Sequence, residues 1–183
     1  MVSGIPIYFV GFMGSGKSTV GRKVAAGLGY NFIDTDLYIV NRFRKSVDEI
    51  FLHEGEATFR KREFAIMEEI AGMPQTVIAT GGGLPCYNNL MEVLNETGYT
   101  VYLQRTPEEL AVRLEKCKRT RPAIKALSSD EIFPFVQQEL AKRESVYSQA
   151  QLSLPVLKII PDDDEDKLVS FILHHLDSIG EIL

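Results

Sequence analysis

Gly11-Phe-Met-Gly-Ser-Gly-Lys-Ser18 is the stretch that decides the fold, because it fits the pattern G-x-x-x-x-G-K-[ST] at every fixed position. An apolar run, Ile5–Val10, precedes it, and a helix-forming stretch, Lys17–Leu28, follows it. In this context glycines let backbone N–H groups point inward at phosphate oxygens, and the helix N-terminus adds partial positive charge. The alternative, a glycine-rich turn that binds nothing, is disfavoured because motif and context agree.

The same loop indicates which groups would contact a nucleotide. Lys17 is placed to reach the β- and γ-phosphates, and the Ser18 hydroxyl is placed to bind Mg²⁺. We therefore expect ATP or GTP, with Mg²⁺ as the cofactor. The residues expected to contact the nucleotide here are Gly14, Ser15, Gly16, Lys17, Ser18 and Thr19.

Outside the loop, short apolar runs alternate with helical stretches. The other predicted strands are Asn31–Ile33, Thr76–Thr80, Tyr99–Leu103 and Leu157–Ile160. The predicted helices are Lys17–Leu28, Ser46–His53, Glu56–Ala71, Asn88–Asn95, Pro107–Glu115, Ser129–Ala150 and Asp164–Leu176. This alternation predicts an α/β fold of the three-layer P-loop NTPase type, with a five-stranded parallel sheet flanked by helices. Ligands of such sheets bind at the carboxyl ends of the strands.

Composition excludes several classes of protein. The net charge of -5 argues against a general nucleic-acid binder, which would normally be basic. No apolar run approaches the roughly 18 residues of a membrane span, and the first residues lack the basic region of a signal peptide. Cys86 and Cys117 make no disulfide framework and are read as reduced thiols. We expect one domain over residues 1–183, a cytoplasmic location and a monomer, with neither nucleic acid nor membrane as a partner.

Two carboxylates, Asp34 and Asp36, follow the second predicted strand. One could hold the water shell of a metal ion, and the other could accept the proton of an attacking hydroxyl. The alternative is that an aspartate merely caps the following helix, as aspartate often does. The neighbouring phosphate loop favours the catalytic interpretation.

Two arginines occupy positions where the helical pattern calls for apolar residues. Arg60 falls on the stripe with Phe64, Met67 and Ala71, and Arg143 falls on the stripe with Val136, Leu140, Tyr147 and Ala150. A buried guanidinium must be paired. Internal partners are available in Glu56 or Glu63 for Arg60, and in Glu139 or Glu144 for Arg143; either arginine could also extend its head to solvent at the stripe edge. Two such arginines in a nucleotide-binding chain suggest instead a shared anionic ligand, for which a carboxylate suits the guanidinium fork.

Two further segments suggest parts of a site. Gly81-Gly82-Gly83 directly follows the third predicted strand, where glycine permits close approach of the backbone to a ligand. The basic segment from Arg113 to Pro122 ends in a proline, and residues 113–128 are expected to form a mobile lid that supplies a cation to a transferring phosphoryl group. The alternative is a solvated basic patch. The acidic run 162–166 is interpreted as complementing the dipole of the last helix.

From Tyr8 to Tyr147 these motifs together resemble the shikimate kinase family. They comprise the phosphate loop, Asp34-Thr-Asp36, Gly55-Glu56 with Phe59-Arg60, Gly81-Gly82-Gly83, Arg121-Pro122, and Arg143 four residues before Tyr147. The resemblance implies a nucleoside-monophosphate-kinase-like fold with substrate-binding helices over about 35–72. It also implies that ATP phosphorylates the 3-hydroxyl of shikimate, a step in the biosynthesis of chorismate and the aromatic amino acids.

The resemblance also implies roles for individual residues. Asp36, Lys17 and Arg121 would be catalytic, with Asp36 activating the hydroxyl and the two cations stabilising the transferred phosphoryl group. Asp34 would act on Mg²⁺ through water beside Ser18, and Arg113 would stack on adenine. Shikimate would be bound by Asp36, Arg60, Gly81, Gly82, Gly83 and Arg143. Pro122 is followed by Ala-Ile where the family usually has leucines, so Arg119 could replace Arg121 as the lid cation.

Rival functions fit the sequence less well. A gluconate, nucleotide or dephospho-coenzyme-A kinase remains within the same class, but the two inward arginines and Asp34-Thr-Asp36 favour a small hydroxy acid. A GTPase switch would need an Asn-Lys-x-Asp element, which the sequence lacks, and an Asp-x-x-Gly after the third strand. The only such pattern is at Asp177–Gly180, near the end of the chain.

Overall fold

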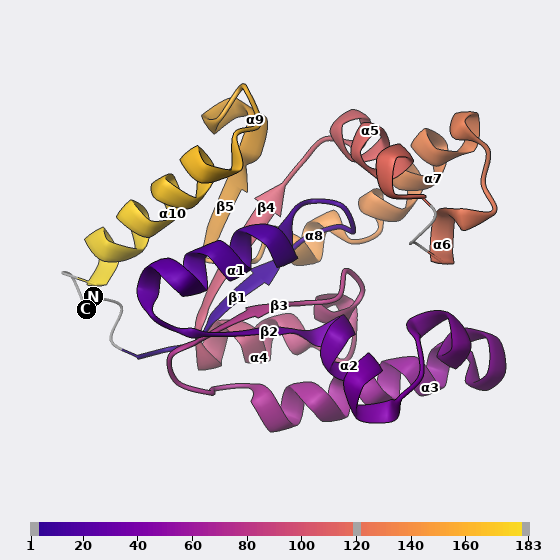
Figure 1. Cartoon of the computed structure of the whole chain (residues 1–183), viewed down its shortest axis with the longest axis horizontal. Helices are drawn as coiled ribbons and strands as arrows, with labels where there is room; N and C mark the ends of the chain where they lie inside the picture. Colours follow the sequence, from indigo (N-terminus) through magenta and orange to yellow (C-terminus); the bar gives the residue numbers. More distant parts are fainter. Residues whose placement is uncertain (1–3, 119–121, 181–183) are drawn as a thin grey trace.

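The computed structural model describes residues 4–118 and 122–180 as an α/β structure built on one parallel sheet. The strands are β1 (Ile7–Val10), β2 (Asn31–Asp34), β3 (Thr76–Ala79), β4 (Tyr99–Gln104) and β5 (Leu152–Pro155). Their order across the sheet is β2-β3-β1-β4-β5, and all four pairings are parallel (Figure 1). The expectation of a five-stranded parallel sheet is confirmed.

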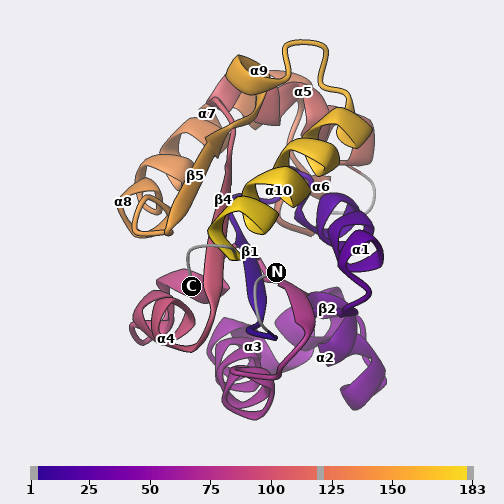
Figure 2. The same cartoon turned by 90° about the vertical axis from the view of Figure 1, so that its left-hand side faces the viewer.

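Helices connect and cover the strands. They are α1 (Lys17–Leu28), α2 (Thr35–Phe43), α3 (Val47–Ile70), the 3₁₀ helix η1 (Leu84–Cys86), α4 (Leu90–Thr97), α5 (Pro107–Cys117), α6 (Pro122–Lys125), α7 (Ser129–Ala141), α8 (Glu144–Tyr147), α9 (Val156–Ile159) and α10 (Glu165–Gly180). Figure 2 shows α1 and α10 on one side of the sheet and α4 and α8 on the other. Among the described residues, no helix combines the length and the apolar character that crossing a membrane requires.

The core has two halves because side chains of a strand alternate between its faces. Within β1, Ile7 and Phe9 join the apolar cluster under α1 and α10, while Tyr8 and Val10 join the cluster formed with α3, α4, α5 and α7. All four side chains are fully buried. A strand buried on both faces has no polar side, which explains the continuous apolar run in the sequence.

The fifth strand lies elsewhere than the sequence predicted. Leu157–Ile160, predicted as a strand, falls mostly within α9, and the strand is Leu152–Pro155 instead. This strand pairs only with β4, at the edge of the sheet. An edge strand tolerates a proline and a serine, because one row of its backbone groups has no ladder partner. The apolar residues of this region pack in the core without forming a strand. Val156, which begins α9, and Ile160, which follows it, are buried.

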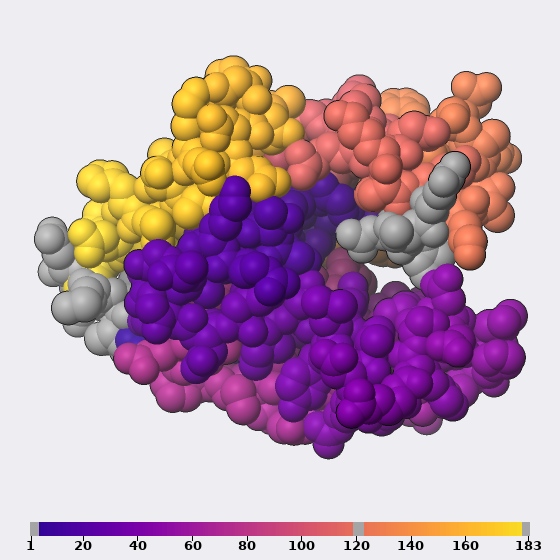
Figure 3. Space-filling view, in the orientation of Figure 1, coloured from indigo at the N-terminus to yellow at the C-terminus, as the bar shows by residue number. Residues whose placement is uncertain are grey.

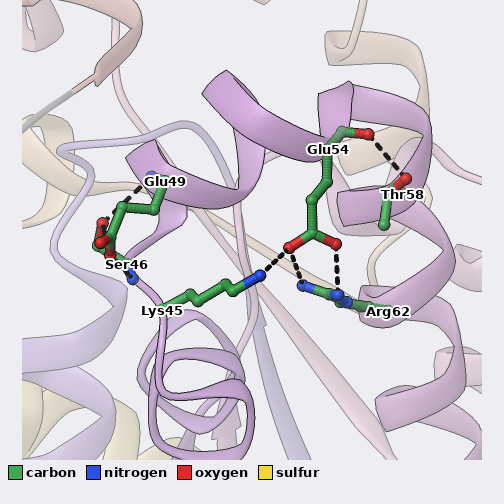
Figure 4. Close-up of polar contacts among 6 residues, drawn as sticks. All are labelled: Lys45, Ser46, Glu49, Glu54, Thr58 and Arg62. Carbon is green, nitrogen blue, oxygen red and sulfur yellow. Dashed lines mark hydrogen bonds and ion pairs between the residues drawn. The ribbon is translucent and has the colours of Figure 1, made fainter.

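Helix α3 contains a kink at Gly55, whose φ of 82° and ψ of 164° are not helical. The kink lies between the two helices predicted to end at His53 and to begin at Glu56. A bridge of charged groups spans it (Figure 4): Glu54 accepts hydrogen bonds from Lys45, before the helix, and from Arg62, after the kink, at 2.8 and 2.5 Å. A capping box of Ser46 and Glu49 starts the first half.

The predicted helix Ser129–Ala150 is interrupted. Helix α7 ends at Ala141, and the short α8 begins at Glu144, so Lys142 and Arg143 lie between two helices. The continuous stripe predicted through Arg143 therefore does not exist as one helix face. Helix α2 was not predicted as a separate element, although it falls within the range expected to form substrate-binding helices.

Candidate active site

The carboxyl ends of four strands open into one cavity of about 680 Å³. The phosphate loop follows β1, Asp34 ends β2, Thr80 follows β3 and Arg105 follows β4. Figure 3 shows the surface hollowed between the salmon surface of α5 and the purple surface of α2 and α3. Of the residues predicted for the site, those lining the cavity are Gly14, Gly16, Lys17, Ser18, Thr19, Asp34, Asp36, Gly82 and Arg113.

The phosphate loop has the backbone that its glycines allow. Gly14 and Gly16 have φ values of 81° and 104°, which side-chain-bearing residues rarely adopt. The Lys17 ammonium folds back over the loop and donates to the carbonyl oxygens of Gly11 and Phe12, at 2.8 and 2.9 Å. Lys17 is only 7% exposed, so its charge lies within the loop that would enclose a phosphate group.

Asp34 caps a helix, as the alternative interpretation held, and it also contacts the phosphate loop. Its Oδ1 caps α2 by accepting from the backbone N–H groups of Asp36 and Leu37. Its Oδ2 accepts a hydrogen bond from the Ser18 hydroxyl at 2.5 Å. The cap fixes the carboxylate, and the second oxygen connects β2 to the first turn of α1. Two hard oxygen donors thus meet at the end of the phosphate loop.

The three glycines after β3 are explained by close approach rather than by positive φ. A Cβ at Gly81 would lie 2.6 Å from Glu63 Oε1 and 2.7 Å from Asp36 Oδ1. At Gly82 it would lie 3.2 Å from the Met13 backbone nitrogen. Each glycine therefore makes room for a different part of the site: the carboxylates, the phosphate loop and, at Gly83, an arginine.

That arginine is Arg60, whose Nη1 would lie 2.6 Å from a Cβ at Gly83. Arg60 donates to Glu63 at 2.5 Å and to Glu56 at 3.1 Å, so both of its predicted internal partners are in place. Glu63 is 1% exposed. Burial raises its pKa to about 7, the nearby Asp36 carboxylate adds to the rise, and Arg60 opposes it.

Arg143 is connected to the glycine segment through Tyr147. It pairs with its predicted partner Glu139 at 2.7 Å, and its guanidinium lies 5.4 Å from the centre of the Phe12 ring. Hydrogen bonding by Lys142, together with the charge of Arg143, lowers the pKa of Glu139. Tyr147, with which Arg143 interacts, donates its buried hydroxyl to the Gly82 carbonyl.

The two arginines approach a common region. Burial raises the pKa of the Cys86 thiol, and the charges of both Arg143 and Arg60 oppose the rise, so both guanidinium groups lie within electrostatic range of that side chain. Neither arginine lines the 680 Å³ cavity. Arg60 borders the glycine segment next to it at Gly83, and Arg143 interacts with Tyr147, which binds the Gly82 carbonyl. Each holds a glutamate partner, and the arrangement is compatible with an anion between them as well as with internal pairing.

The lid is described only in part. Arg119 and Arg121, the alternative lid cations, lie outside the described residues. Arg113 points into the cavity from α5, where it donates to the Gly14 carbonyl at 2.8 Å and to Asp163 at 2.7 Å. Its neighbour Val112 lines the same cavity and is 61% exposed.

Three residues of the site were missed in the sequence. Glu63 was considered only as a partner for Arg60, although its own burial is nearly complete. Arg105 could have been found, because it follows β4 and the ends of parallel strands converge. Asp163 was assigned with its acidic neighbours to the dipole of α10. Asp164 does cap that helix, whereas Asp163 contacts Arg105 and Arg113.

The donor set suits a hard cation that keeps most of its water. In the described chain, no group of three or more His, Cys, Asp or Glu side chains forms a dedicated metal cage. Ser18 and Asp34 instead supply a hydroxyl and a carboxylate beside a phosphate loop. This matches Mg²⁺, which is usually held by one or two protein oxygens, waters and phosphates.

Comparison with known proteins agrees with this geometry. A family model described as shikimate kinase matches residues 13–172. The chain belongs to the shikimate kinase family. A shikimate kinase of Parabacteroides distasonis is 42% identical over 86% of this chain and 91% of its own length. One from Bacteroides thetaiotaomicron is 44% identical over 80% of this chain and 84% of its own.

Solved structures in the family superimpose closely. The Bacteroides thetaiotaomicron shikimate kinase gives a TM-score of 0.86 at 37% identity, covering 94% of this chain and 98% of that one. An Acinetobacter baumannii shikimate kinase, solved in complex with shikimate, gives 0.80 at 31% identity, covering 95% and 96%. A gluconokinase from Sinorhizobium meliloti, at 16% identity and 0.56, shares the fold alone.

Proposed function

We propose that the cavity joins an ATP site on the phosphate loop to a shikimate site beside Gly81-Gly82-Gly83. The reaction is transfer of the γ-phosphate of ATP to the 3-hydroxyl of shikimate, giving shikimate 3-phosphate and ADP. The observation that carries the proposal is the meeting at Gly81–Gly83 of Asp36, the phosphate loop and Arg60. A carboxylate that would accept a proton from the attacking hydroxyl, the loop that would hold the phosphoryl donor, and an arginine that would bind the carboxylate of shikimate therefore flank one short segment.

The nucleotide half uses the loop between β1 and α1. Backbone N–H groups of Gly14, Ser15 and Gly16, and the side chains of Lys17 and Thr19, would bind the phosphates. Lys17 would turn from the Gly11 and Phe12 carbonyls toward the β- and γ-oxygens. Because Lys17 is buried, its charge would be weakly screened and would stabilise the transferred group more than an exposed lysine could.

Mg²⁺ would be held by Ser18, and by Asp34 through water. When bound, it neutralises phosphate charge and orients the β- and γ-oxygens. The Asp34 carboxylate is already fixed by two backbone N–H groups, so it needs little reorganisation. Asp36, two residues further on, would accept the proton of the attacking 3-hydroxyl, since it lines the cavity and lies against Gly81.

The acceptor half would use Arg60 and Arg143 on the shikimate carboxylate. Glu56 and Glu63 already hold the guanidinium of Arg60, and Glu139 holds that of Arg143, and each fork keeps other N–H groups for a ligand. Arg121, or Arg119 in its place, would supply the lid cation, and Arg113 would border the adenine. The glycines between the arginines and the phosphate loop would let the substrate approach the backbone.

The test is a coupled ADP-release assay with Mg-ATP and, separately, shikimate, quinate, gluconate or AMP. The wild type should turn over with shikimate, and Arg60→Ala should raise the KM for shikimate by at least about tenfold, as loss of a charge-assisted contact implies. Lys61→Ala, an exposed cation on the same helix, is the matched control. Turnover with gluconate or AMP but not shikimate would discard the acceptor; unchanged KM in Arg60→Ala would discard only the role of that arginine.

A further inference from the structure

Asp163 joins two arginines that come from different elements. It lies between α9 and α10, with a left-handed φ of 53°. Its Oδ1 accepts from Arg105 Nη2 at 2.6 Å, and its Oδ2 accepts from Arg113 Nη1 at 2.7 Å. Arg105 directly follows β4, and Arg113 lies on the inner face of α5. One carboxylate, in the segment before α10, thus links the residue that follows β4 to helix α5.

Both arginines also bind the phosphate loop. Nε of Arg113 donates to the Gly14 carbonyl at 2.8 Å, and Nε of Arg105 donates to the Ser15 carbonyl at 3.0 Å. A trans peptide is planar, so its C=O and the following N–H point in opposite directions. Fixing the Gly14 and Ser15 carbonyls therefore fixes the direction of the Ser15 and Gly16 N–H groups, and the Ser15 N–H donates within the loop to the Phe12 carbonyl at 3.2 Å.

The arrangement depends on charge balance. The Arg105 side chain is 2% exposed, and a guanidinium so deeply buried needs a carboxylate partner. Asp163 is the carboxylate that it contacts. Arg113 is 27% exposed and rests on the same carboxylate, so removal of its negative charge would leave two cations facing each other beside the nucleotide cavity.

We propose that Asp163 is a positioning residue of the nucleotide site: through Arg105 and Arg113 it sets the orientation of the peptide groups that receive the phosphates of ATP. The inference rests on the proposed binding of ATP at this loop. It concerns nucleotide affinity and not the acceptor, because the glycine segment and Arg60 do not contact this network in the described structure.

The variant that tests this is Asp163→Asn, with Asp162→Asn as its matched control. Asparagine keeps the shape and tolerates a left-handed backbone. It removes the negative charge, however, and replaces one of the two acceptor oxygens with an NH2 group that donates toward an arginine. Asp162 is the adjacent aspartate and is paired with the exposed Lys167. We would measure the KM values for ATP and shikimate, kcat, and the dissociation constant for Mg-ADP by calorimetry, all well below the melting temperature. The melting temperature itself is determined in a separate thermal scan.

We expect Asp163→Asn to raise the KM for ATP and the dissociation constant for Mg-ADP by about tenfold, with the KM for shikimate within about twofold. Asp162→Asn should match the wild type. A lower melting temperature with unchanged ATP parameters would overturn the proposal, since it would show a role in stability alone. If Asp163→Asn does not fold, Arg105→Lys, which keeps the charge but not the fork, must show the same selective loss for ATP or the proposal fails. A wild type inactive with ATP and shikimate would instead refute the proposed function.

Discussion

Glu63 and Arg60 form an ion pair one helical turn apart, with 2.5 Å between Glu63 Oε2 and Arg60 Nη1, and the glutamate lies almost entirely out of solvent. The pair occupies the wall behind Gly81, where the Asp36 carboxylate also lies. Burial raises the pKa of Glu63 from its ordinary 4.5 to about 7, so the folded protein binds this proton more tightly than the unfolded chain does.

The first prediction concerns pH and stability. Between the ordinary pKa and the raised one, the folded state binds more protons, so stability falls as pH rises through this range. Glu63→Gln removes this dependence. The wild type should therefore lose on the order of 2 kcal/mol relative to Glu63→Gln between about pH 4.5 and about pH 7.5, as measured by denaturant unfolding. The exposed Glu56→Gln, which also contacts Arg60, is the control; an equal pH response there would contradict the prediction.

The second prediction separates two neighbouring glycines. Gly83→Ala places a methyl group 2.6 Å from Arg60 Nη1, whereas Gly82→Ala places one 3.2 Å from the Met13 nitrogen and 3.6 Å from the Gly11 carbonyl. Displacement of Arg60 should raise the KM for shikimate by about tenfold, and displacement of the phosphate loop should raise the KM for ATP similarly. Steady-state kinetics with each substrate varied in turn distinguishes the two. Identical effects of both variants would refute the assignment.

The third prediction concerns Mg²⁺. Asp34→Asn keeps a capping oxygen for α2 but removes the charge beside Ser18, so the concentration of Mg²⁺ that gives half-maximal turnover should rise by about tenfold. Titration of Mg²⁺ at fixed ATP measures this. Asp48→Asn, an exposed carboxylate in the first turn of α3, is the control. An unchanged Mg²⁺ requirement in Asp34→Asn would remove Asp34 from the metal site.

The fourth prediction concerns the bridge across the kink in α3 (Figure 4). Glu54→Ala leaves Lys45 and the half-buried Arg62 without their carboxylate, and should lower the free energy of unfolding by about 1 to 3 kcal/mol. Lys45→Ala removes only one half-exposed cation, and should cost less than about 1 kcal/mol. Urea unfolding of both variants makes the comparison. Equal losses would show that the bridge does not act through Glu54.

Local pattern predicted the sheet and the phosphate loop, but not how distant segments meet. The phosphate-loop motif, Gly11–Ser18, predicted β1, the loop and α1 together because all three are contiguous. The edge strand Leu152–Pro155 has too little apolar character to be recognised, so the more apolar Leu157–Ile160 was chosen in its place. The helix through Arg143 looked continuous because spacing alone does not reveal a break at Lys142.

Individual site residues were predictable where they belong to a short motif. Asp34, Asp36 and Gly82 were found, and all three line the cavity. Asp163 was not, because its role depends on Arg105, 58 residues earlier, and no local pattern encodes that distance. A carboxylate beside a helix start has an adequate local explanation, and only the folded structure shows which of several adjacent aspartates turns toward the arginines.

The strand order has a consequence for how the chain is made. β1 pairs with β3 and β4, so Ile7–Val10 has no strand partner until Thr76–Ala79 has been synthesised. At ordinary rates of translation this delay is roughly 3 to 14 seconds, during which the four apolar residues of β1 have no strand partner. Assembly of the sheet from its centre must therefore follow synthesis of its later strands, and the early segment is where a ribosome-associated chaperone would find its target.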